Sequence, residues 1–311
     1  MAPAGLVTGT MEIAIQLRGP YREVLGAARW AEAEGLVAIA LPDHYLASTS
    51  DREAPAWDSL LHFAGLARDT KTIGLVDLVS PITFRHPAVY AKTAVTLADM
   101  SDGRFTLGLG TGWLESEHSS FGIEFFDQKE RFQRLEESLG YLEALRRGRA
   151  FAGRFYQLEQ FAASPPMTVP IVVGGSGLQR TPELAGRYAD EFNLFPNTAS
   201  DTQSRVERCR HAAVDAGRDP DSIRFSFTSI PVAGTTENGY RARLEEAARE
   251  HRREPERLEE RLAHRGIPFG TPERLAPRLD ELRQQGVSRL YLQTGTTEPA
   301  KLEALVAPFR V

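Results

Sequence analysis

The chain of 311 residues contains a single cysteine, Cys209, which excludes a framework of disulfide bonds and a metal cluster held by thiolates. No apolar run approaches the length that crosses a membrane, and the first residues lack the basic start and apolar core of a signal peptide. We therefore expect a cytoplasmic protein with no membrane partner.

Acidic residues outnumber basic residues, 42 to 37. The formal net charge is −5 and the pI is near 5.9, which argues against a nucleic-acid partner because an acidic protein would release few counterions. His, Asp and Glu do not gather at metal-ligand spacing, and neither a Gly-x-Ser-x-Gly motif nor paired carboxylates indicate a hydrolase. Small organic molecules are the expected ligands, without a metal.

The most informative stretch covers residues 102–117. It begins with an Asp-Gly turn and continues with apolar residues at alternate positions up to Leu109, a pattern typical of a strand. Gly108, Gly110 and Gly112 then remove side chains where the strand ends, which would let a flat ligand approach the backbone. The alternative is a glycine-rich loop between two core elements.

Strands and helices alternate along the chain. Short apolar runs predict strands, and amphipathic runs between them, several opened by proline and closed by glycine, predict helices. The expected strands are residues 11–17, 36–41, 72–79, 104–109, 170–173, 190–195, 223–232 and 289–293. The expected helices are 21–34, 57–68, 88–100, 130–147, one from 181, 200–216, 237–264 interrupted by Pro255, 272–285 and one from 299.

Eight strands, each followed by a helix, predict an α/β fold of the (β/α)8 TIM-barrel type, in which the C-terminal ends of the strands meet at one mouth. Neither a repeat nor a linker divides the chain, so residues 1–311 are expected to form one domain. Insertion loops at residues 45–56, 113–128 and 234–270 should close the mouth. A doubly wound sheet is the alternative, but the first strand lacks a following Gly-x-Gly-x-x-Gly.

Candidate site residues follow several of these strands. Asp43-His44 follows the second strand, and the histidine can exchange protons near neutral pH with the aspartate orienting it. The alternative is a turn with a core histidine whose hydrogen bonds are satisfied. Gly110-Thr111-Gly112 follows the fourth strand, and Asn193 lies in the sixth.

A glycine-rich turn, Gly174-Gly175-Ser176-Gly177, follows the fifth strand and precedes a helix capped at Thr181. Consecutive glycines let backbone N–H groups converge on an anion, and the helix start adds its positive dipole end. Arg180 can add a bidentate contact to a phosphate. The sequence therefore predicts a phosphate site here, with a simple tight turn as the alternative.

These motifs together resemble the bacterial luciferase-like superfamily, and specifically its deazaflavin (F420)-dependent oxidoreductase branch. The resemblance covers most of the chain. Its carriers are Pro42-Asp43-His44-Tyr45, Thr83-Phe84-Arg85-His86-Pro87, the run 97–113, Glu130-Arg131-Phe132, the run 173–177, the run 189–193 and Gly270-Thr271-Pro272-Glu273.

The resemblance implies a barrel that binds coenzyme F420 at its mouth and transfers hydride between this cofactor and a small organic substrate, such as a carbonyl, an imine or an activated alkene. The alternative is an FMNH2-dependent monooxygenase that uses oxygen, with FMN as the cofactor. A flavin- or deazaflavin-binding protein without turnover is a third hypothesis. A homodimer or higher homo-oligomer is expected from the resemblance alone.

The resemblance also implies residue roles. His44 and Asp43 are expected beside the ring as catalytic residues. Relatives place a non-prolyl cis peptide in a bulge after the third strand, and the corresponding segment here is Ser80-Pro81-Ile82, where a Ser80-Pro81 cis bond is allowed. The residues expected to bind the cofactor are Ser80, Pro81, Ile82, Gly110, Thr111, Gly112, Gly174, Gly175, Ser176, Gly177, Arg180 and Asn193.

The substrate is harder to infer. Some relatives carry a glutamate directly after Gly-Thr-Gly, whereas this chain has Trp113 there, so oxidation of a sugar phosphate with an acid at that position is not expected. Tyr45, Trp113 and Phe121 are expected to line a largely apolar substrate pocket. Several aromatic residues of these loops could equally belong to the core.

Overall fold

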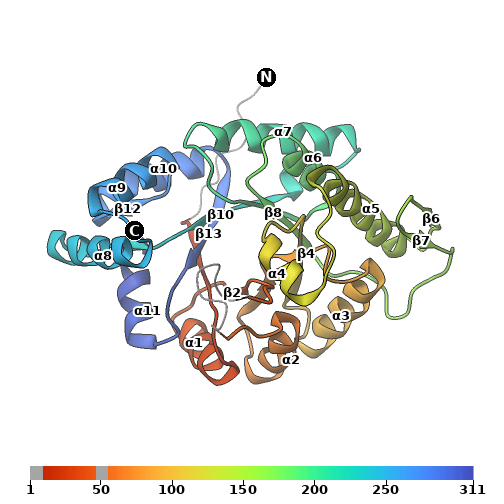
Figure 1. Cartoon of the computed structure of the whole chain (residues 1–311), viewed down its shortest axis with the longest axis horizontal. Helices are drawn as coiled ribbons and strands as arrows, with labels where there is room; N and C mark the ends of the chain where they lie inside the picture. The colour runs from red at the N-terminus through yellow and green to blue at the C-terminus, as the bar shows by residue number, and fades with distance from the viewer. Residues whose placement is uncertain (1–9, 47–54, 311) are drawn as a thin grey trace.

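Parallel strands close into a barrel in the computed structural model, which describes residues 10–46 and 55–310 (Figure 1). The strand order is β3-β2-β1-β13-β10-β9-β8-β5, and pairing of β3 with β5 closes the ring. The short strand β4 continues β3 after a bulge and pairs with β5. This arrangement confirms the predicted (β/α)8 barrel.

The barrel strands are β1 (Glu12–Gln16), β2 (Ala38–Leu41), β3 (Gly74–Asp77), β4 (Ser80–Pro81), β5 (Phe105–Gly110), β8 (Ile171–Gly175), β9 (Glu191–Leu194), β10 (Arg224–Ser229) and β13 (Val287–Gln293). Two small sheets lie outside it. One pairs β6 (Phe151–Ala152) with β7 (Gln157–Leu158), and the other pairs β11 (Val232–Ala233) with β12 (Phe269–Gly270).

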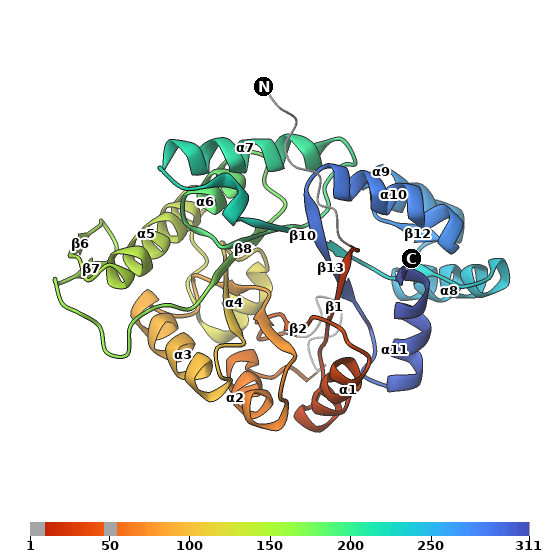
Figure 2. The same ribbon diagram turned by 180° about the vertical axis from the view of Figure 1, so that it is seen from behind.

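Helices surround the barrel in both views (Figures 1 and 2). They are α1 (Tyr21–Ala33), α2 (Ser59–Asp69), α3 (Pro87–Met100), α4 (Glu115–Phe121), α5 (Gln128–Arg146), α6 (Arg180–Tyr188), α7 (Asp201–Asp215), α8 (Glu237–Glu250), α9 (Pro255–His264), α10 (Pro272–Gln284) and α11 (Pro299–Val306), with single 3-10 turns at Pro220–Ser222 and Ala307–Phe309. In the part of the chain that the structure describes, no helix could span a membrane.

Two segments differ from the sequence prediction. The expected loop 113–128 contains the helix α4, which lies across the barrel end that faces the viewer in Figure 1. The helical stretch 237–264, predicted to be interrupted by Pro255, is two separate helices, and Pro255 begins the second of them. Proline suits a first helical position, because the N–H that it lacks has no intrahelical partner there. Part of the expected loop 45–56 lies outside the described residues.

The interior of the barrel has three layers, because alternate residues of each strand point inward. At the N-terminal ends of the strands, Arg289 binds Glu12 at 2.8 Å and Glu191 at 3.2 Å. In the middle, alanines from β1 and β2 pack with Val76, Val172 and Tyr291. At the C-terminal ends the inward side chains are polar, and Gln16, Gln293, Asn193 and Thr228 form this mouth.

Glu32, near the end of α1, anchors the turn that leads into β3. One carboxylate oxygen accepts hydrogen bonds from the backbone N–H groups of Lys71, Thr72 and Ile73 at 2.8, 2.5 and 3.0 Å. Burial acts to raise the pKa of this carboxyl, but the hydrogen bonds outweigh burial and lower the pKa to about 2.

A Glu32→Gln variant tests this anchor. Because the folded pKa lies below the ordinary value of 4.5, the carboxylate stabilises the fold above that pH, and the contribution is lost as the pH falls toward 2. We expect the substitution to lower the free energy of unfolding by about 1–2 kcal/mol at neutral pH, and by less in acid. Denaturant unfolding at both pH values measures the effect.

Glu34→Gln is the matched control, since Glu34 ends the same helix and makes only a surface ion pair with Arg310 at 3.1 Å. It should change stability little at either pH. A loss from Glu32→Gln that is equal at neutral and acidic pH would contradict the assigned role of the charge.

Candidate active site

His44 follows β2 at the mouth and is held by Glu117 from α4. The Nδ1 atom of His44 lies 3.1 Å from each carboxylate oxygen of Glu117, and one of these oxygens also accepts the backbone N–H of Tyr45 at 3.0 Å. The Glu117 side chain is fully buried and that of His44 is 13% exposed. A carboxylate only accepts, so Nδ1 carries the ring hydrogen and Nε2 keeps its lone pair in the neutral ring.

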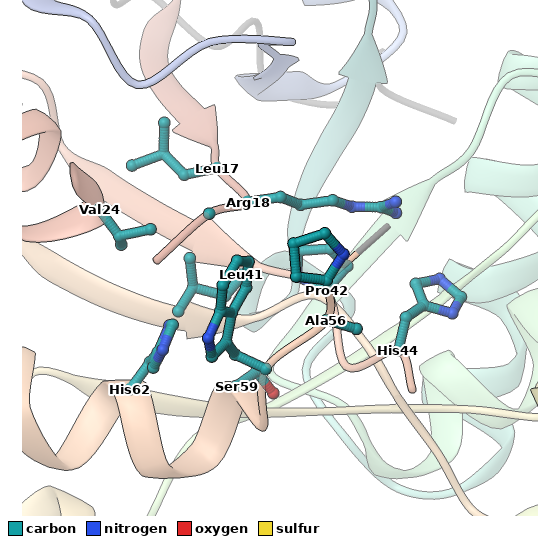
Figure 3. A pocket seen from close by; sticks show the side chains of 12 residues that line it. Leu17, Arg18, Val24, Leu41, Pro42, His44, Ala56, Ser59 and His62 are labelled. Atoms are coloured by element: carbon teal, nitrogen blue, oxygen red, sulfur yellow. The ribbon is translucent and has the colours of Figure 1, made fainter. Parts of the chain in front are cut away.

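A pocket lies beside His44, lined by residues from the ends of β1 and β2 and from the start of α2 (Figure 3), and its volume is about 400 Å³ when the solvent at its opening is counted. Arg18 extends past Pro42 toward His44, on the side of the pocket away from His62. Burial lowers the pKa of Arg18, and the negative charge of Glu117 offsets part of that shift. Arg18 thus places a cation near the histidine that the buried carboxylate of Glu117 holds.

Asp43 has a different partner from the one expected. Its carboxylate accepts a hydrogen bond from Ser80 Oγ at 2.9 Å and forms an ion pair with Arg85, which also binds Asp58 at 2.7 Å. Asp43 therefore links the end of β2 to β4 and to the loop that follows it. The orienting contact to His44, which the sequence analysis gave to Asp43, is made by Glu117.

A second buried carboxyl lies next to this cluster. Asp77, the last residue of β3, is fully buried, and burial together with the charge of Asp43 raises its pKa well above the usual value. The neutral form of Asp77 is therefore favoured over its charged form. Asp43, by contrast, pairs with the Arg85 guanidinium.

The bulge between β3 and β4 contains the non-prolyl cis peptide Leu78-Val79. The sequence analysis allowed a cis bond at Ser80-Pro81, two residues later, and that location is wrong. The Leu78 carbonyl accepts a hydrogen bond from Gln16 Nε2 at 2.8 Å. Ser80 is fully buried and Ile82 belongs to the outer core, so the partly exposed residue of the bulge is Val79.

The strand-end glycines make room for this bulge. A Cβ atom on Gly110 would lie 2.8 Å from one methyl group of Val79, and a Cβ atom on Gly174 would lie 3.1 Å from the other methyl group of Val79. A Cβ atom on Gly108 would lie 1.7 Å from the Asp77 carbonyl oxygen. Val79 therefore lies between strands that carry no side chains at this level. Val79 and the bare strand ends around it form an apolar platform, and the base of this platform is Val79 rather than bare backbone.

The glycine turn 174–177 joins β8 to α6 as predicted. The predicted cap at Thr181 is wrong, because α6 begins at Arg180 after Gln179 and its first turn has no side-chain cap. Ser176 is exposed, and the Arg180 guanidinium lies 4.6 Å from the centre of the Phe132 ring. Arg205 from α7 fixes the turn by donating hydrogen bonds to the carbonyl oxygens of Gly175 and Phe195. Burial lowers the pKa of Arg205 to about 10, so it stays charged.

Asn193 and the expected pocket aromatics also lie at the mouth. Asn193 is buried and shares hydrogen bonds with Ser226 and Thr228 at 3.0 and 2.9 Å, which fixes its side chain within the barrel. The Trp113 ring meets His44 edge to face at 5.9 Å and is 68% exposed. The Tyr45 ring stacks on Phe84 at 4.2 Å, and the 58% exposed Phe121 lies 5.3 Å from Tyr45.

Sequence reasoning missed four residues of this site: Arg18, Gln16, Val79 and Glu117. One signal for the helix 115–121 is Gly122, which follows it and ends α4 in the left-handed conformation with φ of +68°. Acidic residues in the first turn, including Glu115 and Glu117, also favour a helix there. In the described part of the chain, no three His, Cys, Asp or Glu residues could hold a metal ion.

Comparison with known proteins gives a family. The family model described as luciferase-like monooxygenase matches residues 3–301. The F420-dependent glucose-6-phosphate dehydrogenase of Nakamurella multipartita is 33% identical over 65% of this chain and 60% of that protein. The F420-dependent hydroxymycolic acid dehydrogenase of Mycobacterium tuberculosis is 30% identical over 69% and 60%. The chain thus spans about 60% of the length of these curated relatives.

Solved structures share the fold at low sequence identity. An F420-dependent secondary alcohol dehydrogenase in complex with an F420-acetone adduct superposes with a TM-score of 0.76 at 18% identity, covering 97% of this chain and 98% of that one. The EDTA monooxygenase of Chelativorans superposes with a TM-score of 0.80 at 16% identity, covering 97% and 93%. The barrel architecture is common to both.

Alanine substitutions at two glycines test the platform. Gly108→Ala should lower the free energy of unfolding by about 3 kcal/mol or more, because its Cβ meets a backbone carbonyl that cannot move aside. Gly110→Ala should cost about 1–3 kcal/mol, because its Cβ meets only a methyl group of Val79. Thermal unfolding of each variant measures the loss.

A double-mutant cycle with Val79→Ala separates contact with the Val79 methyl groups from contact with the backbone carbonyl of Asp77. Val79→Ala should recover most of the loss from Gly110→Ala and little of the loss from Gly108→Ala. Gly26→Ala in α1 is the control, since its Cβ meets nothing within 4 Å and alanine favours the helix. Equal recovery at both glycines would show that Val79 does not form the platform as described.

Proposed function

The chain belongs to the luciferase-like monooxygenase family, and we propose that it is an oxidoreductase that uses the deazaflavin coenzyme F420 to exchange hydride with a small organic substrate. The observation that carries this proposal is the His44–Glu117 pair at the same mouth as the Leu78-Val79 bulge. Support for the cofactor comes from relatives that are named as F420-dependent dehydrogenases.

Two parts of the mouth would hold the cofactor. The platform of Val79, Gly110 and Gly174 would carry the ring, and the turn 174–177 with Arg180 would bind its phosphate. When bound, a deazaflavin supplies hydride transfer in a two-electron step, and its reduced form resists oxygen.

His44 supplies the proton transfer in this proposal. Its Nε2 takes the hydroxyl proton of an alcohol during oxidation, or donates a proton to a carbonyl oxygen during reduction. Glu117 keeps the other hydrogen on Nδ1 and stabilises the imidazolium when His44 is protonated. The exposed ring of Trp113 and the Tyr45–Phe121 pair would cover a substrate and reduce access of water.

A binding titration tests the cofactor. We expect oxidised F420 to bind the purified protein with micromolar or tighter affinity and FMN to bind at least ten times more weakly, as measured from the absorbance or fluorescence of each chromophore. A preference for FMN would overturn this proposal in favour of an FMNH2-dependent monooxygenase. Failure of both cofactors to bind would contradict either activity.

A Glu117→Gln variant tests the histidine pair. The amide preserves the shape of the side chain but can also donate to Nδ1, so the tautomer of His44 is no longer fixed. We expect kcat to fall by about 10²–10⁴ for reoxidation of reduced F420 by whichever carbonyl, imine or alkene the wild-type protein accepts. The affinity for F420 should stay the same.

Glu115→Gln is the control on the same helix, because Glu115 is exposed and lies away from His44. It should leave kcat and cofactor affinity unchanged. If Glu117→Gln keeps wild-type kcat across the pH range, the pair does not govern proton transfer.

A further inference from the structure

A second cleft opens on the side of the mouth formed by the ends of β9, β10 and β13. Its volume is about 720 Å³ when the solvent at its opening is counted. Thr228 and Gln293 line it from the barrel, and α9 with the turn after α8 lines it from outside. Gln293 donates a hydrogen bond to Gln16 at 2.6 Å, and Gln16 holds the Leu78 carbonyl of the bulge. The cleft is therefore connected to the platform through one chain of hydrogen bonds.

The cleft is strongly basic in an acidic protein. Arg253, Arg261, Arg265 and His251 line it, and among the described residues of its lining there is no Asp or Glu. The positive charges act on one another. Burial lowers the pKa of Arg265, and Arg261 lowers it further.

His251 experiences the same field. Burial lowers its pKa, the charge of Glu250 offsets part of the shift, and Arg243, Arg261 and Arg253 lower it further. In its neutral form the imidazole still has one N–H to donate. Three guanidinium groups and this donor therefore face one cleft.

Ion pairs set these arginines apart from their neighbours. On α9 and α10, Arg257 binds Glu260 at 2.9 Å and Arg274 binds Glu259 at 2.5 Å. By contrast, within residues 10–46 and 55–310, Arg253 and Arg261 have no carboxylate within ion-pair distance. The guanidinium groups of Arg253 and Arg261 are therefore available to bind an anionic ligand.

An apolar wall accompanies the charge. Leu258 and Leu262 alternate with Arg261 and Arg265 at the i, i+3, i+4 and i+7 spacing that places four side chains on one face of α9. Ile230 and Ile267 add to the apolar lining. Such a cleft fits a molecule that carries both an apolar part and an anionic group.

We propose that this cleft binds the carboxylate or phosphate group of the molecule whose reacting part lies at the Val79 platform. The proposal rests on the proposed function and names the substrate class: an amphiphilic organic anion rather than the largely apolar molecule expected from the sequence. The cofactor tail is the other possible source of the anion. The substrate is favoured because the turn 174–177 with Arg180 can accept a cofactor phosphate.

The test compares wild-type protein with Arg253→Gln/Arg261→Gln. The probes are hexanoate, hexyl phosphate and hexanol, titrated by calorimetry with and without F420. The wild-type protein should bind the two anions at least tenfold more tightly than hexanol, and the double variant should lose at least tenfold of that affinity. Equal binding of anions by both proteins, with unchanged F420 affinity, overturns the proposal.

A second titration distinguishes the sources of the anion. F420 and its chromophore FO, which lacks the phosphate-bearing tail, should each bind the wild type and the double variant equally if the cleft takes the substrate. If the double variant binds F420 more weakly than the wild type does but binds FO equally well, the cleft is assigned to the cofactor tail. Retained anion binding without F420 binding would reject the proposed function and keep the basic cleft.

Two further variants guard against indirect effects. Arg257→Gln lies on the same helix and outside the cleft, so it should bind every probe as the wild type does. Arg253→Lys/Arg261→Lys keeps the charge and should recover most of the anion affinity. If the lysine variant behaves as the glutamine variant does while its thermal unfolding is unchanged, charge is not what the cleft contributes.

Discussion

One buried carboxylate, that of Glu117, determines the arrangement of the active site. It accepts the Nδ1 hydrogen of His44 and the backbone N–H of Tyr45, so a single side chain fixes the ring, the loop after β2 and the position of α4. Burying an anion is costly unless hydrogen bonds and a nearby cation compensate it, and Arg18 supplies such a cation. The short helix α4 therefore positions His44 as well as lying across the end of the barrel.

The bulge is the second constraint, and it depends on residues distant in sequence. Gly108, Gly110 and Gly174 leave the space that the Asp77 carbonyl and the Val79 side chain occupy. On the other face of the sheet, Asp43 and Arg85 hold β4 against the end of β2. A parallel barrel brings all these strand ends to one edge, which is why packing around one peptide bond positions the cofactor platform and the histidine together.

The sequence predicts the features that repeat along the chain, and it fails where a contact joins distant residues. Strand and helix periodicity gave the barrel, and the strand ends gave His44 and the glycines. The cis peptide was placed at Ser80-Pro81 because proline is the residue that lowers the cost of a cis bond, whereas Leu78-Val79 has no such local mark. Glu117 lies 73 positions from His44 on a helix of seven residues, too short to show a clear period.

The distribution of charge over the surface is likewise not predictable from the composition of the chain. A net charge of −5 describes the whole chain, but helix geometry sorts the mixed Arg and Glu residues of α9 onto different faces. Glu259 and Glu260 are used in ion pairs with Arg274 and Arg257, while Arg261 and Arg265 follow Leu258 and Leu262 into the cleft. These two glutamates are thus paired outside the cleft, and an acidic protein presents a basic surface in a cleft beside the mouth of the barrel.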